Sequence, residues 1–93
     1  MTVATLRLDL RFRETFTSKE TRRQMKVIMD KLRMHFNVSV AEADLGTDPA
    51  SAILVVATVS RLRRDGLETL ERVAEAVLAH PRAEILAHAI TEV

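Results

Sequence analysis

The stretch from residue 17 to residue 42, TSKETRRQMKVIMDKLRMHFNVSVAE, most constrains the fold, because it joins a capped amphipathic helix directly to a strand. Thr17 can accept a hydrogen bond from the Glu20 amide, and the Glu20 side chain can return one to the Thr17 amide, which is the capping-box pattern. The helix should run to about residue 36, with Asn37 as the left-handed residue that ends it. Apolar residues recur inside it at three- and four-residue spacing and predict one stripe that faces a core: Met25, Ile28, Met29, Leu32 and Phe36.

The other flank of this helix is strongly basic and is interrupted by Asp30. Further basic residues precede the helix on an expected strand, which should end where the helix begins. All of these cations should therefore share one end of the domain, beside helix amides that can meet a phosphate. A charge run on a helix is also often only a solvated face, and both readings stay open. The candidate nucleic-acid-binding residues are Lys19, Arg22, Arg23, Lys26, Arg11 and Arg13.

The remaining segments have strand and helix signatures of their own. Residues 6 to 12 alternate between apolar and charged side chains, which predicts a strand with one buried face. Residues 52 to 60 are almost continuously apolar and rich in β-branched side chains, which favours a central strand. Between them we expect a strand over residues 38 to 44, of ambiguous facing, and a hairpin turn over residues 46 to 49. A second helix should begin at a capping box formed by Asp65 and Glu68 and end before Pro81, followed by a strand over residues 84 to 93.

The resulting order, β-α-β-β-α-β, predicts a single ferredoxin-like domain over residues 1–93. In this α+β arrangement a four-stranded antiparallel sheet has the order 4-1-3-2, and right-handed crossovers place both helices on one face. The first helix has a basic excess and the second an acidic one, so the two can partly neutralise each other. A second basic cluster, Arg61, Arg63 and Arg64, follows the third strand and should lie at the far end of the domain.

Composition limits the cellular setting and the class of partner. The chain has no cysteine, which excludes disulfides and thiolate metal sites and agrees with a reducing compartment. We expect a cytoplasmic protein without a membrane span, because no window approaches about 18 consecutive apolar residues. The formal net charge of +1 argues against a strongly basic, dedicated nucleic-acid binder.

Two motifs carry a resemblance to a known family. The stretch Thr17-Ser18-Lys19-Glu20-Thr21-Arg22, followed by Phe36-Asn37-Val38-Ser39-Val40-Ala41-Glu42, resembles the YlxP-like family of small uncharacterised bacterial proteins. The second motif matches the family pattern F-N-V-S-V-A-E at every position, whereas the first departs from S-L-K-E-K-R at Thr17, Ser18 and Thr21 and so lacks one basic group. The resemblance implies a ferredoxin-like fold and, because the family's genes often lie beside those for translation factors, a role near the ribosome. It supplies no catalytic residues.

These observations predict a protein that makes electrostatic contacts to RNA or the ribosome through the basic helix. Recognition by base stacking on the sheet would need exposed aromatic residues, but the chain has no Tyr or Trp, and Phe12 should be buried. The alternative is a homodimeric protein-interaction module, or a module for a small ligand, that uses the open sheet face. That face should carry Arg7, Asp9 and Arg11 beside Glu84, His88 and Glu92, with an apolar group formed by Leu54, Val56, Leu86 and Ile90.

An enzyme is the least supported class. A phosphate-binding loop after the first strand would need glycine, and residues 13 to 18 contain none. His35, His80 and His88 have no partner histidine three or four residues away, so no metal site is expected. We therefore predict no catalytic residues, no metal and no cofactor.

Overall fold

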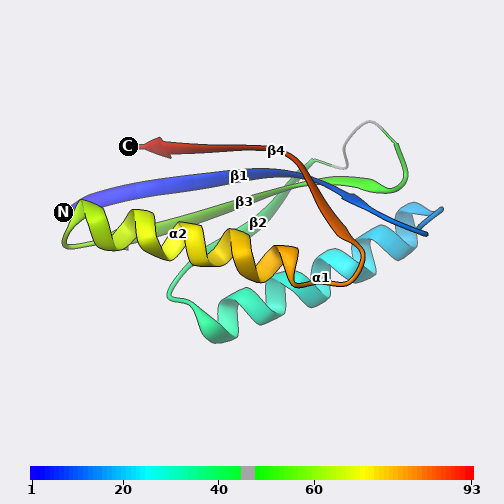
Figure 1. Ribbon diagram of the computed structural model, residues 1–93, viewed down its shortest axis with the longest axis horizontal. Coiled ribbons are helices and arrows are strands. Elements are labelled where there is room, and N and C mark those ends of the chain that lie inside the picture. Colours follow the sequence, from blue (N-terminus) through cyan, green and yellow to red (C-terminus); the bar gives the residue numbers. More distant parts are fainter. Residues whose placement is uncertain (45–47) are drawn as a thin grey trace.

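The computed structural model describes residues 1–44 and 48–93 and has the expected order of elements (Figure 1). A strand, a helix and two strands are followed by a second helix and a last strand. Their bounds are β1 Thr2–Phe12, α1 Ser18–His35, β2 Ser39–Asp44, β3 Ser51–Ser60, α2 Arg63–Leu78 and β4 Ala83–Glu92.

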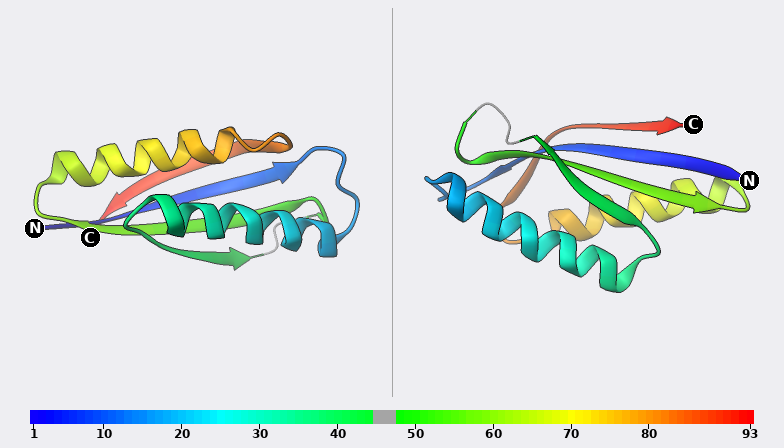
Figure 2. Two further views of the ribbon diagram at one scale, coloured as in Figure 1. Left: turned by 90° about the horizontal axis from the view of Figure 1, so that it is seen from below. Right: turned by 180° about the vertical axis from the view of Figure 1, so that it is seen from behind.

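The four strands form one antiparallel sheet in the order β2-β3-β1-β4, which confirms the predicted 4-1-3-2 order. Both helices cover the same face of this sheet, and the opposite face is open (Figures 1 and 2). The core lies between the helices and the covered face. It is supplied mainly by the alternating residues of β1 and by the apolar stripes of the helices, including Leu6, Leu8, Leu10, Phe12, Met25, Ile28, Leu32, Leu70 and Val73.

The start of α1 follows the prediction in part. Thr17 is the N-cap, and its Oγ1 accepts a hydrogen bond from the Glu20 amide at 3.1 Å. In place of the expected return bond to the Thr17 amide, the Thr17 hydroxyl donates to Glu20 Oε1 at 3.3 Å. Asn37 as a left-handed terminator is wrong. The helix ends in extended backbone at Phe36, and the one non-glycine residue with positive φ among the described residues is Glu14, at 54°.

The N-cap of α2 lies three residues before Asp65, the first residue of the expected capping box. Leu62 is the N-cap and makes no side-chain capping bond, while Asp65 lies within the first turn. The carboxylate of Asp65 therefore meets the positive end of the helix dipole without acting as a cap. Gly66 is buried in this turn, and a Cβ there would lie 3.0 Å from the Ser60 hydroxyl oxygen. Glycine thus allows α2 to begin close against the end of β3.

The strands β2 and β3 pair as the expected hairpin, although residues 46 and 47 of the predicted turn lie outside the described residues. The ambiguous facing of β2 is settled by burial: Val40 faces the core, whereas Ala41 and Ala43 are exposed. Neither helix in the described part of the chain is long and apolar enough to cross a membrane.

A β-bulge in β4 changes which of its side chains share a face. Asp9 lies opposite Ala87, but Leu10 lies opposite Ile85, so Leu86 is an extra residue on β4. The alternation of side chains along β4 is inverted beyond this point. His88 and Ile90 consequently lie opposite Leu8 and Leu6 on the helix side of the sheet, where both remain exposed because α2 does not cover them.

Candidate nucleic-acid interface

One end of the domain brings together the loop between β1 and α1, the approach to β3 and the approach to β4. The Phe12 amide donates to the Ala50 carbonyl at 2.9 Å, and the Arg13 amide donates to the Arg82 carbonyl at 2.9 Å. The buried Thr21 hydroxyl, in the first turns of α1, donates to the Pro49 carbonyl. These bonds fix the amino-terminal end of α1 against the end of the sheet.

The amino-terminal half of α1 presents Lys19, Arg22 and Arg23 to solvent. None of the three forms an ion pair or hydrogen bond with another side chain of residues 1–43 and 48–93. Because Arg22 and Arg23 follow Lys19 by three and four residues, the three side chains lie on one continuous patch of the helix. We call Lys19, Arg22 and Arg23 the free cation cluster.

Further along the same helix, Lys26 and Arg33 share one acidic partner. Asp30 accepts from Lys26 at 3.0 Å and from Arg33 at 3.4 Å, and Arg33 also donates to the Val40 carbonyl at 3.2 Å. Lys26 follows Arg22 by one helical turn but differs from it in having an acidic partner. Of the four predicted cations on α1, three therefore belong to the free cation cluster and one does not.

The two candidate arginines from the end of β1 are placed differently from α1. Arg13 donates to the Pro81 carbonyl at 2.6 Å and pairs with Glu84 at 3.6 Å, so it ties β1 to the start of β4. Arg11 is exposed and lies opposite Glu84 in the β1–β4 register. Because alternate residues of β1 are buried under the helices, Arg11 points to the open face, away from α1. The structure therefore does not join Arg11 and Arg13 to the free cation cluster.

The second basic cluster lies at the opposite end of the domain, as expected. Arg63 pairs with Glu92 at the end of β4, and Arg64 contacts Asp65 at 3.7 Å. The two basic regions do not merge. Arg63 and Arg64 thus each have an acidic partner, unlike the residues of the free cation cluster.

The predicted apolar group on the open face is partly wrong. Leu54 and Val56 are fully buried, because they lie opposite Leu8 and Leu6 under the helices. Leu86 and Ile90 are exposed, but the bulge in β4 places Ile90 on the helix side of the sheet. The apolar side chains of β3 that face the open side are those of its odd-numbered residues: Ile53, Val55, Ala57 and Val59.

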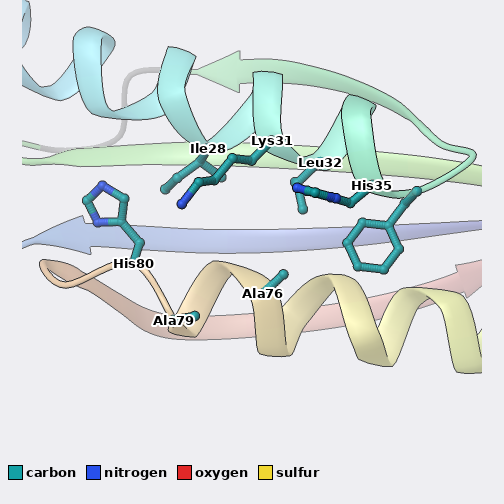
Figure 3. Close-up of a pocket in the computed structure, with 8 residues that line it drawn as sticks. Ile28, Lys31, Leu32, His35, Ala76, Ala79 and His80 are labelled. Carbon is teal, nitrogen blue, oxygen red and sulfur yellow. The ribbon is translucent and has the colours of Figure 1, made fainter.

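A cleft of about 220 Å³ lies between α1 and α2 (Figure 3). The small side chains of Ala76 and Ala79 leave this space, which Lys31 and His35 border from α1 and His80 borders from the end of α2. The fold thus brings two of the three isolated histidines to one cleft. The described residues contain no group of three or more His, Asp or Glu side chains arranged to hold a metal ion.

His80 is fixed by its surroundings. Its Nδ1 accepts a hydrogen bond from the Arg82 amide at 3.2 Å, and its ring packs edge-on against Phe12 with the ring centroids 5.7 Å apart. Burial lowers the pKa of His80, and the positive charges of Lys31 and Arg82 lower it further. The neutral form therefore carries its proton on Nε2.

Sequence reasoning missed Phe16 as a residue of this region. Its side chain is 80% exposed, and it immediately precedes the N-cap of α1, next to the free cation cluster. The expectation concerned aromatic residues on the sheet face, whereas Phe16 lies in the loop between β1 and α1. The sequence contained one signal of this exposure. An apolar residue before an N-cap often packs against an apolar fourth residue of the helix, but in this chain the fourth residue is the polar Thr21.

The arrangement of strands and helices defines the class of domain. A four-stranded antiparallel sheet with two helices on one face, in the observed order, defines a ferredoxin-like α+β domain. Residues 3–90 match the family model described as "Protein of unknown function (DUF503)", and the chain belongs to this family. This match confirms the expectation that the chain belongs to a family of small uncharacterised proteins.

Solved structures support the fold. A crystal structure described as a "Putative Chlorite dismutase" matches with a TM-score of 0.60 at 18% sequence identity. The match covers 99% of this chain and 44% of the other, so the chain spans less than half the length of that protein. A comparison with curated proteins finds no match.

Proposed function

We propose that this protein contacts RNA phosphates through the free cation cluster Lys19, Arg22 and Arg23 as a non-enzymatic, translation-associated module. The observation that carries this proposal is the contrast along α1, where three adjacent exposed cations have no acidic partner among the described side chains while Lys26 and Arg33 share Asp30. Cations without internal partners are available for an external anion. The resemblance to the YlxP-like family supports ribosomal RNA as that anion.

No acidic side chain of residues 1–43 and 48–93 forms an ion pair with the cluster. Glu20 is engaged with the Thr17 hydroxyl at the N-cap, and Glu42, on the neighbouring strand β2, forms no ion pair with α1. One carboxylate oxygen of Glu42 is buried without a hydrogen-bond partner. A phosphate at the cluster would also meet the positive end of the α1 dipole.

The proposal is tested by measuring the affinity of the purified protein for a short RNA over a range of salt concentrations. Three phosphate contacts predict a slope of log K against log salt of about −2 to −3. A flat salt dependence, or the absence of binding at low salt, would reject the proposal.

A second proposed function, homodimerisation through the open sheet face, is favoured by β3. This strand is apolar on both faces, as a strand buried on both sides would be, but the helices cover only one of them. Strand spacing and rise give the open face an area of roughly 600 Å², so two stacked copies would bury about 1,200 Å² in total. This value is at the lower end of stable interfaces.

Sedimentation equilibrium of the full chain tests this second proposal. Val55→Glu, in the outward row of β3, should convert a dimer to a monomer because it would bury a charge. Val27→Glu on the exposed side of α1 is the matched control and should leave the dimer intact, since Val27 is 47% exposed and distant from the open face. A monomer for the unaltered chain at high concentration would exclude dimerisation.

A further inference from the structure

The exposed Phe16 side chain is unusual because the structure around it is well fixed. The preceding Thr15 is buried, donates to the Arg13 carbonyl at 3.1 Å and accepts from the Gln24 side chain at 2.6 Å. Glu14 adopts a left-handed backbone conformation, which is uncommon for a residue other than glycine. This short loop therefore holds the backbone of Phe16 in place while leaving its ring in solvent.

No packing role in the described structure accounts for this aromatic ring. An apolar residue immediately before an N-cap usually packs against the fourth residue of the helix. In this protein the fourth residue is Thr21, whose hydroxyl is already used by the Thr17 and Pro49 carbonyls. Phe16 remains 80% exposed, while the chain's other two phenylalanines are buried or half-buried.

Phe16 lies close in sequence to the free cation cluster, and this position suggests a role for its exposed ring. It lies three residues before Lys19, the first member of the free cation cluster, at the start of the same helix. Single-stranded nucleic acid is commonly held by cations that contact its backbone and by aromatic side chains on which its bases stack. In duplex RNA the base faces are not accessible for such stacking.

We propose that Phe16 stacks on an unpaired base while Lys19, Arg22 and Arg23 contact the adjoining phosphates, so that this surface selects single-stranded RNA over duplex RNA. This inference rests on the proposed function and deepens it by naming the class of RNA. Stacking on a phenyl ring does not read base edges, so sequence preference should be weak.

The test is fluorescence anisotropy with a labelled single-stranded oligouridine and, separately, an RNA duplex of equal length. Phe16→Leu keeps an apolar side chain but removes the ring, and it should weaken binding to the single strand about 5- to 100-fold, as expected for the loss of one stacked base. Affinity for the duplex should be unchanged, and Phe16→Tyr should bind the single strand as the unaltered protein does. The salt slope should be the same in all three proteins, because no charge is altered.

Each outcome distinguishes the two proposals. Salt-dependent binding that is equal for the unaltered protein and Phe16→Leu would overturn the stacking inference and leave the phosphate contact intact. Equal affinity for single strand and duplex would also overturn it. Absence of binding by the unaltered protein would reject both the phosphate contact and the stacking. Circular dichroism of Phe16→Leu serves as the folding control, and an unfolded variant would show that the ring is structural and so contradict the inference.

Discussion

The two halves of α1 have the same kind of surface sequence, but their cations differ in whether they have an acidic partner. In the amino-terminal half, Lys19, Arg22 and Arg23 have no acidic partner among the described side chains, whereas in the carboxyl-terminal half Asp30 accepts from both Lys26 and Arg33. One acidic residue at the right spacing is enough to give two cations an internal partner. The comparison shows that partner geometry, more than the number of cations, decides which part of a basic helix is available to an anion.

The largest expected effect comes from removing charge from one half at a time. Arg22→Gln/Arg23→Gln should weaken RNA binding roughly 10- to 100-fold near 0.1 M salt and reduce the salt slope by about 2, since two phosphate contacts are lost. Lys26→Gln/Arg33→Gln removes the same formal charge from the two cations that share Asp30 and is the matched control. Fluorescence anisotropy would contradict the comparison if both double variants lost the same affinity.

Removing the N-cap of α1 should destabilise the start of the helix that carries the free cation cluster. Thr17→Ala deletes the acceptor for the Glu20 amide and should lower the free energy of unfolding by about 1 kcal/mol. Thr17→Ser keeps the hydroxyl and is the control. Chemical denaturation measures the difference, and equal stability of all three proteins would show that this cap contributes nothing.

Releasing Lys26 and Arg33 from Asp30 should extend the available surface. Asp30→Asn removes the acidic partner of Lys26 and Arg33, and we expect RNA affinity to rise several-fold at low salt with a steeper salt slope. The free energy of unfolding should fall only by about 0.3–1 kcal/mol, because these ion pairs are exposed. An unchanged affinity would mean that Lys26 and Arg33 cannot reach the bound RNA.

The smallest expected effect concerns the flank of α1 that faces α2, where Lys31 approaches His80. Because the pKa of His80 is lowered in the folded protein, the unfolded chain binds the proton more readily. The stabilisation from the neutral imidazole is therefore complete above the unfolded pKa of 6.5 and is lost as the pH falls below it. Denaturation at several pH values should show a weaker decline below that value in His80→Gln than in the unaltered protein.

Much of the fold could be predicted because its determinants are local. The alternation in β1, the apolar stripe and the Thr17 cap of α1, and the β-branched run of β3 each specify an element from a few neighbouring residues. In contrast, the facing of Leu54 and Val56 could not be read from the sequence, because β3 is apolar at both parities and only its register with β1 decides which side is buried. The bulge at Leu86 likewise arises from strand pairing and inverts β4 without any glycine or proline signal.

The candidate site could be predicted only in part, because contacts between distant parts of the chain also determine it. The positions of the cations on α1 follow from helical spacing, but their availability depends on which of them meets an acid. Arg13 illustrates the limit, since its partners Pro81 and Glu84 are about 70 residues away in the chain. The exposure of Phe16 depends on a loop that is fixed by the hydrogen bond between Gln24 and Thr15. No short sequence motif predicts this hydrogen bond.

The most direct test of the phosphate contact is co-sedimentation of the protein with ribosomal subunits at low and high salt. The unaltered protein should sediment with the subunits at low salt and be released at high salt. Lys26→Glu/Arg33→Glu should behave similarly, whereas Arg22→Glu/Arg23→Glu should not sediment in either condition. Undiminished association of Arg22→Glu/Arg23→Glu would contradict the account and show that the amino-terminal half of α1 is ordinary solvated surface.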